Sequence, residues 1–140
     1  MSVLDEPAVA GSRLDRLLDG AVTSRLHLAL VLVGRLKMDA RTVLDLRWSQ
    51  VDLVRNEVTG AGAPVRLTGP VPELFYWHAV RQRLDFSLTR RWADPGYVFV
   101  NRYGSRFTAE QADAVVAQHC RDAGLPAVPL AGLRHPVWAG

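Results

Sequence analysis

The chain has 140 residues, of which 49% are hydrophobic and 22% are charged, and these proportions are typical of one globular domain. Its single cysteine, Cys120, excludes an intramolecular disulfide and therefore a disulfide-stapled secreted scaffold. The formal net charge is +3, and 16 of the 17 basic residues are arginine. Arginine suits phosphate and base edges, but so small a net charge favours nucleic-acid binding only slightly.

The most apolar segment, Leu26 to Val33, is far shorter than the ~20 residues that a helix needs to cross a bilayer. The first ten residues contain Asp5 and Glu6 and have neither a basic start nor an apolar stretch, so they do not resemble a secretory signal. We therefore expect a soluble protein that stays in the cytoplasm and has no membrane partner.

Three helices are predicted in the first third of the chain, after a flexible leader at residues 1–11. The first helix follows Ser12, a suitable N-cap, and its apolar side chains recur at helical spacing: Leu14, Leu17, Leu18, Ala21 and Val22. The second covers the apolar segment and is expected to be buried on most sides. Asp39 can cap a third helix that includes Val43, Leu44 and Leu46.

The hydrophobic period changes after Ser49. From there to Leu67, apolar residues lie among turn-formers, which predicts a small antiparallel sheet of two or three short strands. Pro70 and Pro72 then introduce a fourth helix. Its apolar residues are Leu74, Phe75, Trp77, Val80 and Leu84. Its solvent-exposed face is expected to carry Arg81, Gln82 and Arg83.

The C-terminal third begins with a short extended segment, predicted for Tyr97 to Val100. Thr108 and Gln111 have the spacing of a capping box, so a long helix is predicted from there to a stop at Gly124. Its apolar face includes Ala112, Val115, Val116, His119, Cys120 and Ala123. His119 is interpreted as a packed histidine, because a metal site needs three or four ligands and no others are close in sequence.

The order of these elements, with three local motifs, resembles the catalytic domain of the tyrosine recombinases, the phage-integrase family. Leu46 to Asp52 reads Leu-Arg-Trp-Ser-Gln-Val-Asp and is similar to the family's Leu-Arg-Trp-Ser-Asp-Ile-Asp stretch. Tyr97-Val98-Phe99, with Gly104 and Thr108, resembles a second family segment, in which an aromatic residue and Phe are followed by Gly-x-x-hydrophobic-Thr/Ser. Ala123-Gly124-Leu125, followed by Leu133-Arg134-His135, resembles a third family segment, which reads Ala-Gly-hydrophobic and then His-x-Leu-Arg-His. The resemblance implies a single integrase-catalytic-domain-like domain at 12–140, mainly α with a small antiparallel β-sheet (α+β).

The resemblance also implies phosphoryl transfer, in which a tyrosine attacks a phosphodiester while two arginines, a lysine and histidines assist. Several of these groups are absent. The first arginine falls at Asp39, the first histidine falls at Ala131, and the hairpin between Val54 and Leu67 has no lysine. Arg41 is expected to point to the opposite side of its helix. Arg35, one turn upstream, could reach the same face as Asp39.

The tyrosines Tyr76, Tyr97 and Tyr103 all precede Arg134, and none matches the position of the family's nucleophile. We therefore expect a domain truncated before the nucleophile segment. Because catalytic groups of this kind act as a unit, we predict no recombinase activity, no catalytic residue, no metal and no cofactor.

Arg134 is the arginine of the motif that remains, and it is the best candidate for a phosphate contact, particularly if it lies at a helix start, where backbone N–H groups also favour anions. An ordinary surface arginine is the alternative. Six residues are candidate contacts to double-stranded DNA: Arg134, His135, Arg66, Arg55, Arg102 and Arg106. A further set of arginines could line a DNA backbone or form a solvated face: Arg81, Arg83, Arg90 and Arg91.

Three functional hypotheses follow. The first is a catalytically inactive recombinase-like domain with a DNA-associated regulatory or accessory role. The second is a protein-interaction module without DNA binding, in which a second copy or a partner protein fills the groove where family members exchange C-terminal segments. The third is a recombinase fragment that receives its tyrosine from another chain. A degraded remnant without a role is a further alternative.

Overall fold

The computed structural model describes residues 12–60, 62–89 and 96–139, so the predicted leader lies outside the described residues. Helix α2 (Arg13–Gly20) begins at Ser12, as predicted. The Ser12 hydroxyl accepts a hydrogen bond from Asp15 N, and the Asp15 carboxylate accepts one from Ser12 N. This reciprocal capping box pairs two backbone amides that the start of a helix otherwise leaves unsatisfied.

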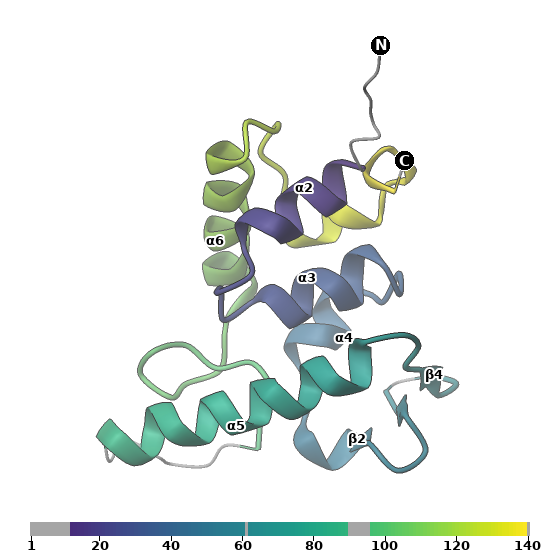
Figure 1. Cartoon of the computed structure of the whole chain (residues 1–140), viewed down its shortest axis with the longest axis vertical. Helices are drawn as coiled ribbons and strands as arrows, with labels where there is room; N and C mark the ends of the chain where they lie inside the picture. The colour runs from purple at the N-terminus through teal and green to yellow at the C-terminus, as the bar shows by residue number, and fades with distance from the viewer. Residues whose placement is uncertain (1–11, 61, 90–95, 140) are drawn as a thin grey trace.

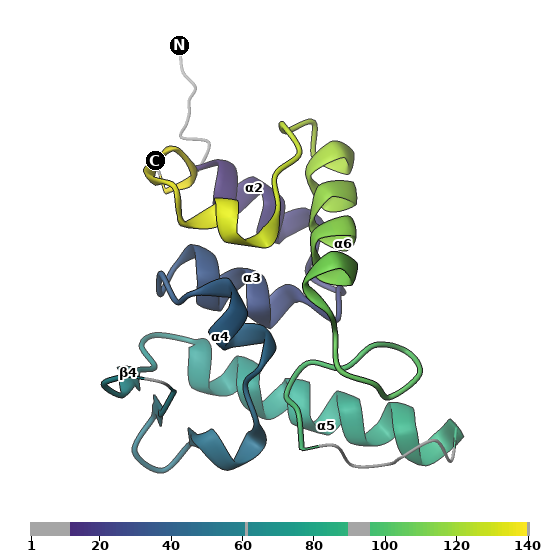
Figure 2. The same cartoon turned by 180° about the vertical axis from the view of Figure 1, so that it is seen from behind.

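Helix α3 (His27–Gly34) lies at the centre of the domain (Figure 1), and every residue from Leu28 to Gly34 is buried. A helix that is apolar all round needs neighbours on all sides. Its neighbours are α2, α4 (Ala40–Leu44), α5 (Val71–Thr89) and the 3-10 helix η2 (Leu130–Arg134). Seen from behind, α4 and η2 lie on either side of α3 (Figure 2). The predicted buried helix is therefore confirmed as the core of the fold.

A close approach between α2 and α3 depends on Gly34. A Cβ atom at this position would lie 2.6 Å from Leu14 Cδ1, closer than non-bonded Cβ contacts come in real proteins, so Leu14 would have to shift. The absence of a side chain at Gly34 thus lets Leu14 pack directly against the end of α3.

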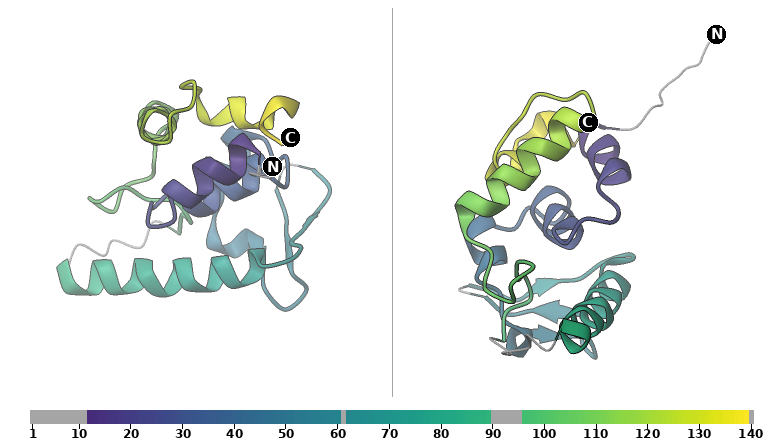
Figure 3. Two further views of the ribbon diagram at one scale, coloured as in Figure 1. Left: turned by 45° about the horizontal axis from the view of Figure 1, so that its top comes forward. Right: turned by 90° about the vertical axis from the view of Figure 1, so that its left-hand side faces the viewer.

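The predicted small sheet has three antiparallel strands in the order β2-β3-β4. They are β2 (Val51–Asp52), β3 (Glu57–Val58) and β4 (Val65–Arg66), and the 3-10 helix η1 (Trp48–Gln50) leads into the first. Asn56 has a φ of 54° in the turn between β2 and β3. Such positive values suit asparagine in tight turns. The sheet lies beside the first turns of α5 (Figure 3).

Helix α5 corrects part of the prediction for its two sides. Phe75 is buried as expected, but Trp77 and Leu84 are 58% and 57% exposed. Gln82, expected on the solvent-exposed face, is buried and bridges two segments. Its Oε1 accepts from Trp48 Nε1 at 3.0 Å, and its Nε2 donates to the Val98 carbonyl oxygen at 2.9 Å. Gln82 therefore connects α5 to η1 and to the extended segment.

The C-terminal third follows the prediction closely. Helix α6 (Ala109–Asp122) begins with the Thr108–Gln111 capping box, and Gly124, with a φ of 71°, follows its end. The extended segment forms isolated bridges at Tyr97 and Val100 but no regular strand. The chain then turns through η2 and η3 (Pro136–Trp138), which packs against α2.

These elements make the domain mainly helical with a small antiparallel sheet, as predicted. The third helix is shorter than expected, because α4 ends at Leu44 and leaves Leu46 outside it. Over the described ranges, no helix is both long and apolar enough to cross a membrane.

Replacing Gln82 by leucine should lower the free energy of unfolding by about 1–3 kcal/mol, because the part-buried Trp48 N–H would lose its acceptor. Urea denaturation followed by circular dichroism measures the change. The neighbouring variant Arg83→Gln is the control, since Arg83 is exposed, and its effect should stay within about 0.5 kcal/mol. Equal stabilities for Gln82→Leu and the parent would contradict the bridging role.

Candidate functional site

Asp39 has two roles at the start of α4. One carboxylate oxygen, Oδ2, accepts hydrogen bonds from Thr42 N at 3.2 Å and from Thr42 Oγ1 at 3.3 Å, so Asp39 is the N-cap that the sequence predicts. The other oxygen, Oδ1, lies 4.0 Å from Arg134 Nη1. The position assigned to the family's first arginine thus carries a negative charge, and that charge is paired with the arginine that remains.

The packing around α3 brings these two residues together from distant parts of the sequence. Helix α4 and η2 both contact α3, Asp39 precedes α4, and Arg134 is the last residue of η2. Arg134 therefore lies at the end of η2 and not at its start, so the backbone N–H groups at the start of η2 do not assist it. Its side chain remains 48% exposed and can reach solvent.

A surface hollow of about 540 Å³ opens beside this pair. It is called the Asp39 hollow below, and its lining residues are Asp39, Ala40, Arg41, Leu44, Asp45, Arg106, Phe107, Ala109, Asp113, Leu130 and Ala131. Three aspartates line it, and two arginines line it together with Arg134 at its edge. The formal charges of these six side chains cancel, so the hollow is not a basic pocket.

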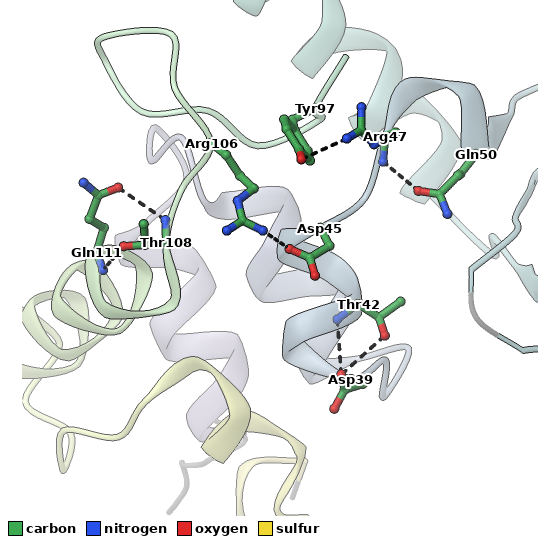
Figure 4. A network of polar contacts seen from close by, with 9 residues as sticks. All are labelled: Asp39, Thr42, Asp45, Arg47, Gln50, Tyr97, Arg106, Thr108 and Gln111. Carbon is green, nitrogen blue, oxygen red and sulfur yellow. Dashed lines mark hydrogen bonds and ion pairs between the residues drawn. The ribbon is translucent and has the colours of Figure 1, made fainter. Parts of the chain in front are cut away.

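A second ion pair, between Asp45 and Arg106, also lines the hollow. Arg106 Nη1 contacts Asp45 Oδ1, and the Arg106 guanidinium also lies 5.7 Å from the centre of the Tyr97 ring. Arg47 donates to the Tyr97 hydroxyl at 2.9 Å and lies over the same ring at 4.4 Å. Figure 4 shows these side chains converging between α4 and the loop before α6. Arg106 is thus held by a carboxylate and an aromatic ring.

Arg41 and Arg35, the two arginines near Asp39 in the sequence, have different surroundings. Arg41 was expected to point away from Asp39, but it lines the same hollow. Arg35 donates to the Asp15 carboxylate of α2 at 2.8 Å. This hydrogen bond is the main reason why the pKa of Asp15 is lowered from its ordinary value. Arg35 therefore belongs to the contact between α2 and α3.

The four remaining candidate DNA contacts lie apart from the Asp39 hollow. Arg55 is in the turn between β2 and β3, with its side chain 77% exposed and 4.0 Å from Asp52. Arg66 is exposed on β4, where Glu57 is its register partner. Arg102 is exposed and lies 5.0 Å over the Tyr103 ring. His135 caps η3, because its Nδ1 accepts from Val137 N at 3.2 Å.

Arg90 and Arg91 lie outside the described residues. Arg81 donates to the Thr23 carbonyl oxygen at 3.0 Å, and Arg83 is exposed. Within the ranges that the structure describes, no group of three or more histidines, cysteines or carboxylates is placed to hold a metal ion. Cys120 is a buried free thiol and His119 beside it is partly buried.

The comparisons with known proteins rest on the fold. No protein-family model matches the sequence, and no curated protein matches it. The crystal structure of XerA recombinase is similar to 98% of this chain, with a TM-score of 0.74 and 18% sequence identity. The chain has a recombinase-like fold. It spans 49% of the XerA chain, about half its length, and at this identity the likeness concerns the fold alone.

Several residues of the Asp39 hollow were not found by sequence reasoning. Asp45 and Asp113 had no local motif to mark them, and their partners are distant. Asp45 pairs with Arg106, and Asp113 Oδ1 accepts from Leu130 N at 2.9 Å. The register of the first motif pointed to Asp39, and the register of the third motif pointed to Ala131 and Arg134.

The capping role of Asp39 can be separated from its ion pair. Asp39→Ala should lower the free energy of unfolding by about 1 kcal/mol, because α4 loses its cap. Asp39→Asn should change it by less than about 0.5 kcal/mol, because asparagine caps as well as aspartate and an exposed ion pair contributes little. Thermal and urea denaturation of both variants test this. Equal losses in the two variants would show that the ion pair, not the cap, stabilises α4.

Proposed function

We propose that this protein is a catalytically inactive recombinase-like domain that associates weakly with the backbone of double-stranded DNA, in a regulatory or accessory role. The neighbour with the similar fold is a recombinase by its name. From this likeness we infer an affinity for DNA. We do not infer phosphoryl transfer, because the residues of the Asp39 hollow do not suit it.

One observation carries the proposal. Three positions assigned to the family's catalytic set lie close together although they come from distant parts of the sequence: Asp39 and Ala131 line one hollow, and Arg134 pairs with Asp39. This clustering supports the register on which the assignment rests. At those positions the chain has a carboxylate, a methyl group and one arginine.

The charges at this place oppose phosphoryl transfer. Two arginines would stabilise the charge that develops on the phosphate oxygens, whereas a carboxylate repels those oxygens and competes for the second arginine. Ala131 has no proton to donate. The hairpin between Val54 and Leu67 has no lysine, and its arginines rarely donate a proton near neutral pH.

Exposed arginines at other places support association with a DNA backbone. Arg55 and Arg66 are on the sheet, and Arg102 is in the loop before α6. Phosphate contacts of this kind position a protein on DNA without reading its sequence. Arg134 is paired with Asp39, and Arg106 is paired with Asp45. Because of this pairing, these two arginines contribute less to phosphate binding than unpaired arginines would. Low affinity and strong salt dependence follow.

Neutralising Asp39 should strengthen DNA binding. Asp39→Asn keeps the cap of α4, frees Arg134 and removes a charge that repels phosphate, so the Kd for a labelled duplex should fall about three- to tenfold at low salt. Fluorescence anisotropy at about 50 and 200 mM salt measures it. Parent binding should be in the micromolar range and weaken steeply with salt.

Asp19→Asn is the matched control, because it removes the same charge from an exposed position on α2. Its Kd should change less than about twofold, since Asp19 is not among the residues that line the Asp39 hollow. Arg134→Ala should weaken binding more in the Asp39→Asn background than in the parent. Absence of binding by all these proteins at low salt would refute the DNA-associated function and favour the protein-interaction hypothesis.

The absence of catalysis has its own test. A nicked duplex that traps a covalent protein–DNA intermediate should give no adduct with the parent on a denaturing gel. The reason is that the Asp39 hollow lacks the two unpaired arginines and the proton donor that phosphoryl transfer needs. A known active recombinase on the same duplex is the positive control. An adduct mapped to Tyr76, Tyr97 or Tyr103 would overturn the proposed inactivity.

A further inference from the structure

We propose that the outward side of α5 is a self-association surface, on which two copies of this chain pair through antiparallel α5 helices. The surface, called the Trp77 face below, consists of Glu73, Tyr76, Trp77 and Arg81 on α5 and of Val22 beyond the end of α2. It is separate from the Asp39 hollow and does not depend on DNA binding.

The Trp77 face is apolar and open to solvent. Tyr76, Trp77 and Val22 are 55%, 58% and 63% exposed. Val22, Trp77 and Arg81 line one shallow hollow, so the residue after α2 is continuous with the helix surface. The opposite side of α5 carries the buried Phe75 and Gln82. Contiguous exposed aromatic and aliphatic side chains, rimmed by charges, mark interaction sites on soluble domains.

The aromatic side chains of the face are already held in place. The Tyr76 and Trp77 rings meet edge to face with 5.3 Å between centroids, and the Trp77 indole N–H donates to Glu73 Oε1 at 3.4 Å. Arg81 is anchored on the Thr23 carbonyl oxygen. Side chains fixed before association lose less conformational entropy when they bind. Tyrosine, tryptophan and arginine are also the residues that dominate binding energy at interfaces.

The charges of the face favour a second copy as its occupant. Glu73 and Arg81 lie four residues before and four residues after Trp77, on one side of the helix. When two α5 helices run antiparallel about a two-fold axis at Trp77, each Glu73 faces Arg81 of the other copy. A parallel arrangement would place like charges together. The face is therefore complementary to itself in the way that an isologous dimer requires.

The size of the face limits the affinity. A buried tyrosine or tryptophan contributes about 150–250 Å², so these few side chains cover less than the ~800 Å² that each partner buries in a standard interface. We expect a reversible dimer with a Kd on the order of 10–100 µM.

Sedimentation equilibrium without DNA, at roughly 10–500 µM protein, tests the proposal. The parent should shift reversibly from monomer to dimer. Trp77→Ala should weaken the dimer at least about tenfold. Glu73→Arg or Arg81→Glu alone should weaken it about three- to tenfold. The combination of both should recover part of that loss, because the swapped charges again face each other, although Trp77 and Thr23 lose their contacts to Glu73 and Arg81. Circular dichroism checks that each variant is folded.

Val54→Ser is the matched control. Val54 is 94% exposed in the turn after β2, so its loss removes exposed apolar surface away from the Trp77 face and should leave the dimer unchanged. A parent that stays monomeric throughout, or a dimer that tolerates Trp77→Ala, would overturn the proposal. A double charge swap no better than the single ones would overturn the antiparallel arrangement. Loss of DNA binding in Trp77→Ala with a monomeric parent would assign the face to DNA instead.

Discussion

The burial of α3 is the constraint on which the rest of this domain depends. A helix that is apolar on every side must be covered on every side, and α2, α4, α5 and η2 together cover it. Two of these neighbours, α4 and η2, have polar ends that reach the surface at the same place. The contact between Asp39 and Arg134 is thus a consequence of core packing, because each residue lies at the end of a segment that α3 holds in position.

The chemistry of the Asp39 hollow follows from how its charges are paired. Each pair is partly exposed and contributes little to stability, yet pairing strongly changes what the hollow attracts. Unpaired arginines would draw a phosphate, whereas arginines that already contact carboxylates offer no net positive potential. A fold shared with a recombinase and a site with cancelled charges are compatible, since function depends on the side chains that a fold presents.

Sequence reasoning predicted the elements better than it predicted their surroundings. Helical spacing and the caps at Ser12, Asp39 and Thr108 gave the helix starts, because these signals are local. Periodicity could not place Gln82 or Trp77 correctly, since burial on α5 depends on η1 and the extended segment, which are distant in sequence. The site was predicted in part: the motifs led to Arg134 and Asp39, but their contact, like that of Asp45 with Arg106, depends on tertiary packing.

The two roles of Asp39 restrict how this site can change over evolution. A guanidinium has no hydrogen-bond acceptor, so an arginine at position 39 could not cap α4 as the carboxylate does. α4 has five residues, and the loss of its cap would cost about 1 kcal/mol, a sizeable fraction of the stability of a small domain. An arginine at position 39 would therefore need a compensating change elsewhere. Selection for stability alone would thus preserve the carboxylate at position 39, and with it the cancelled charges of the Asp39 hollow.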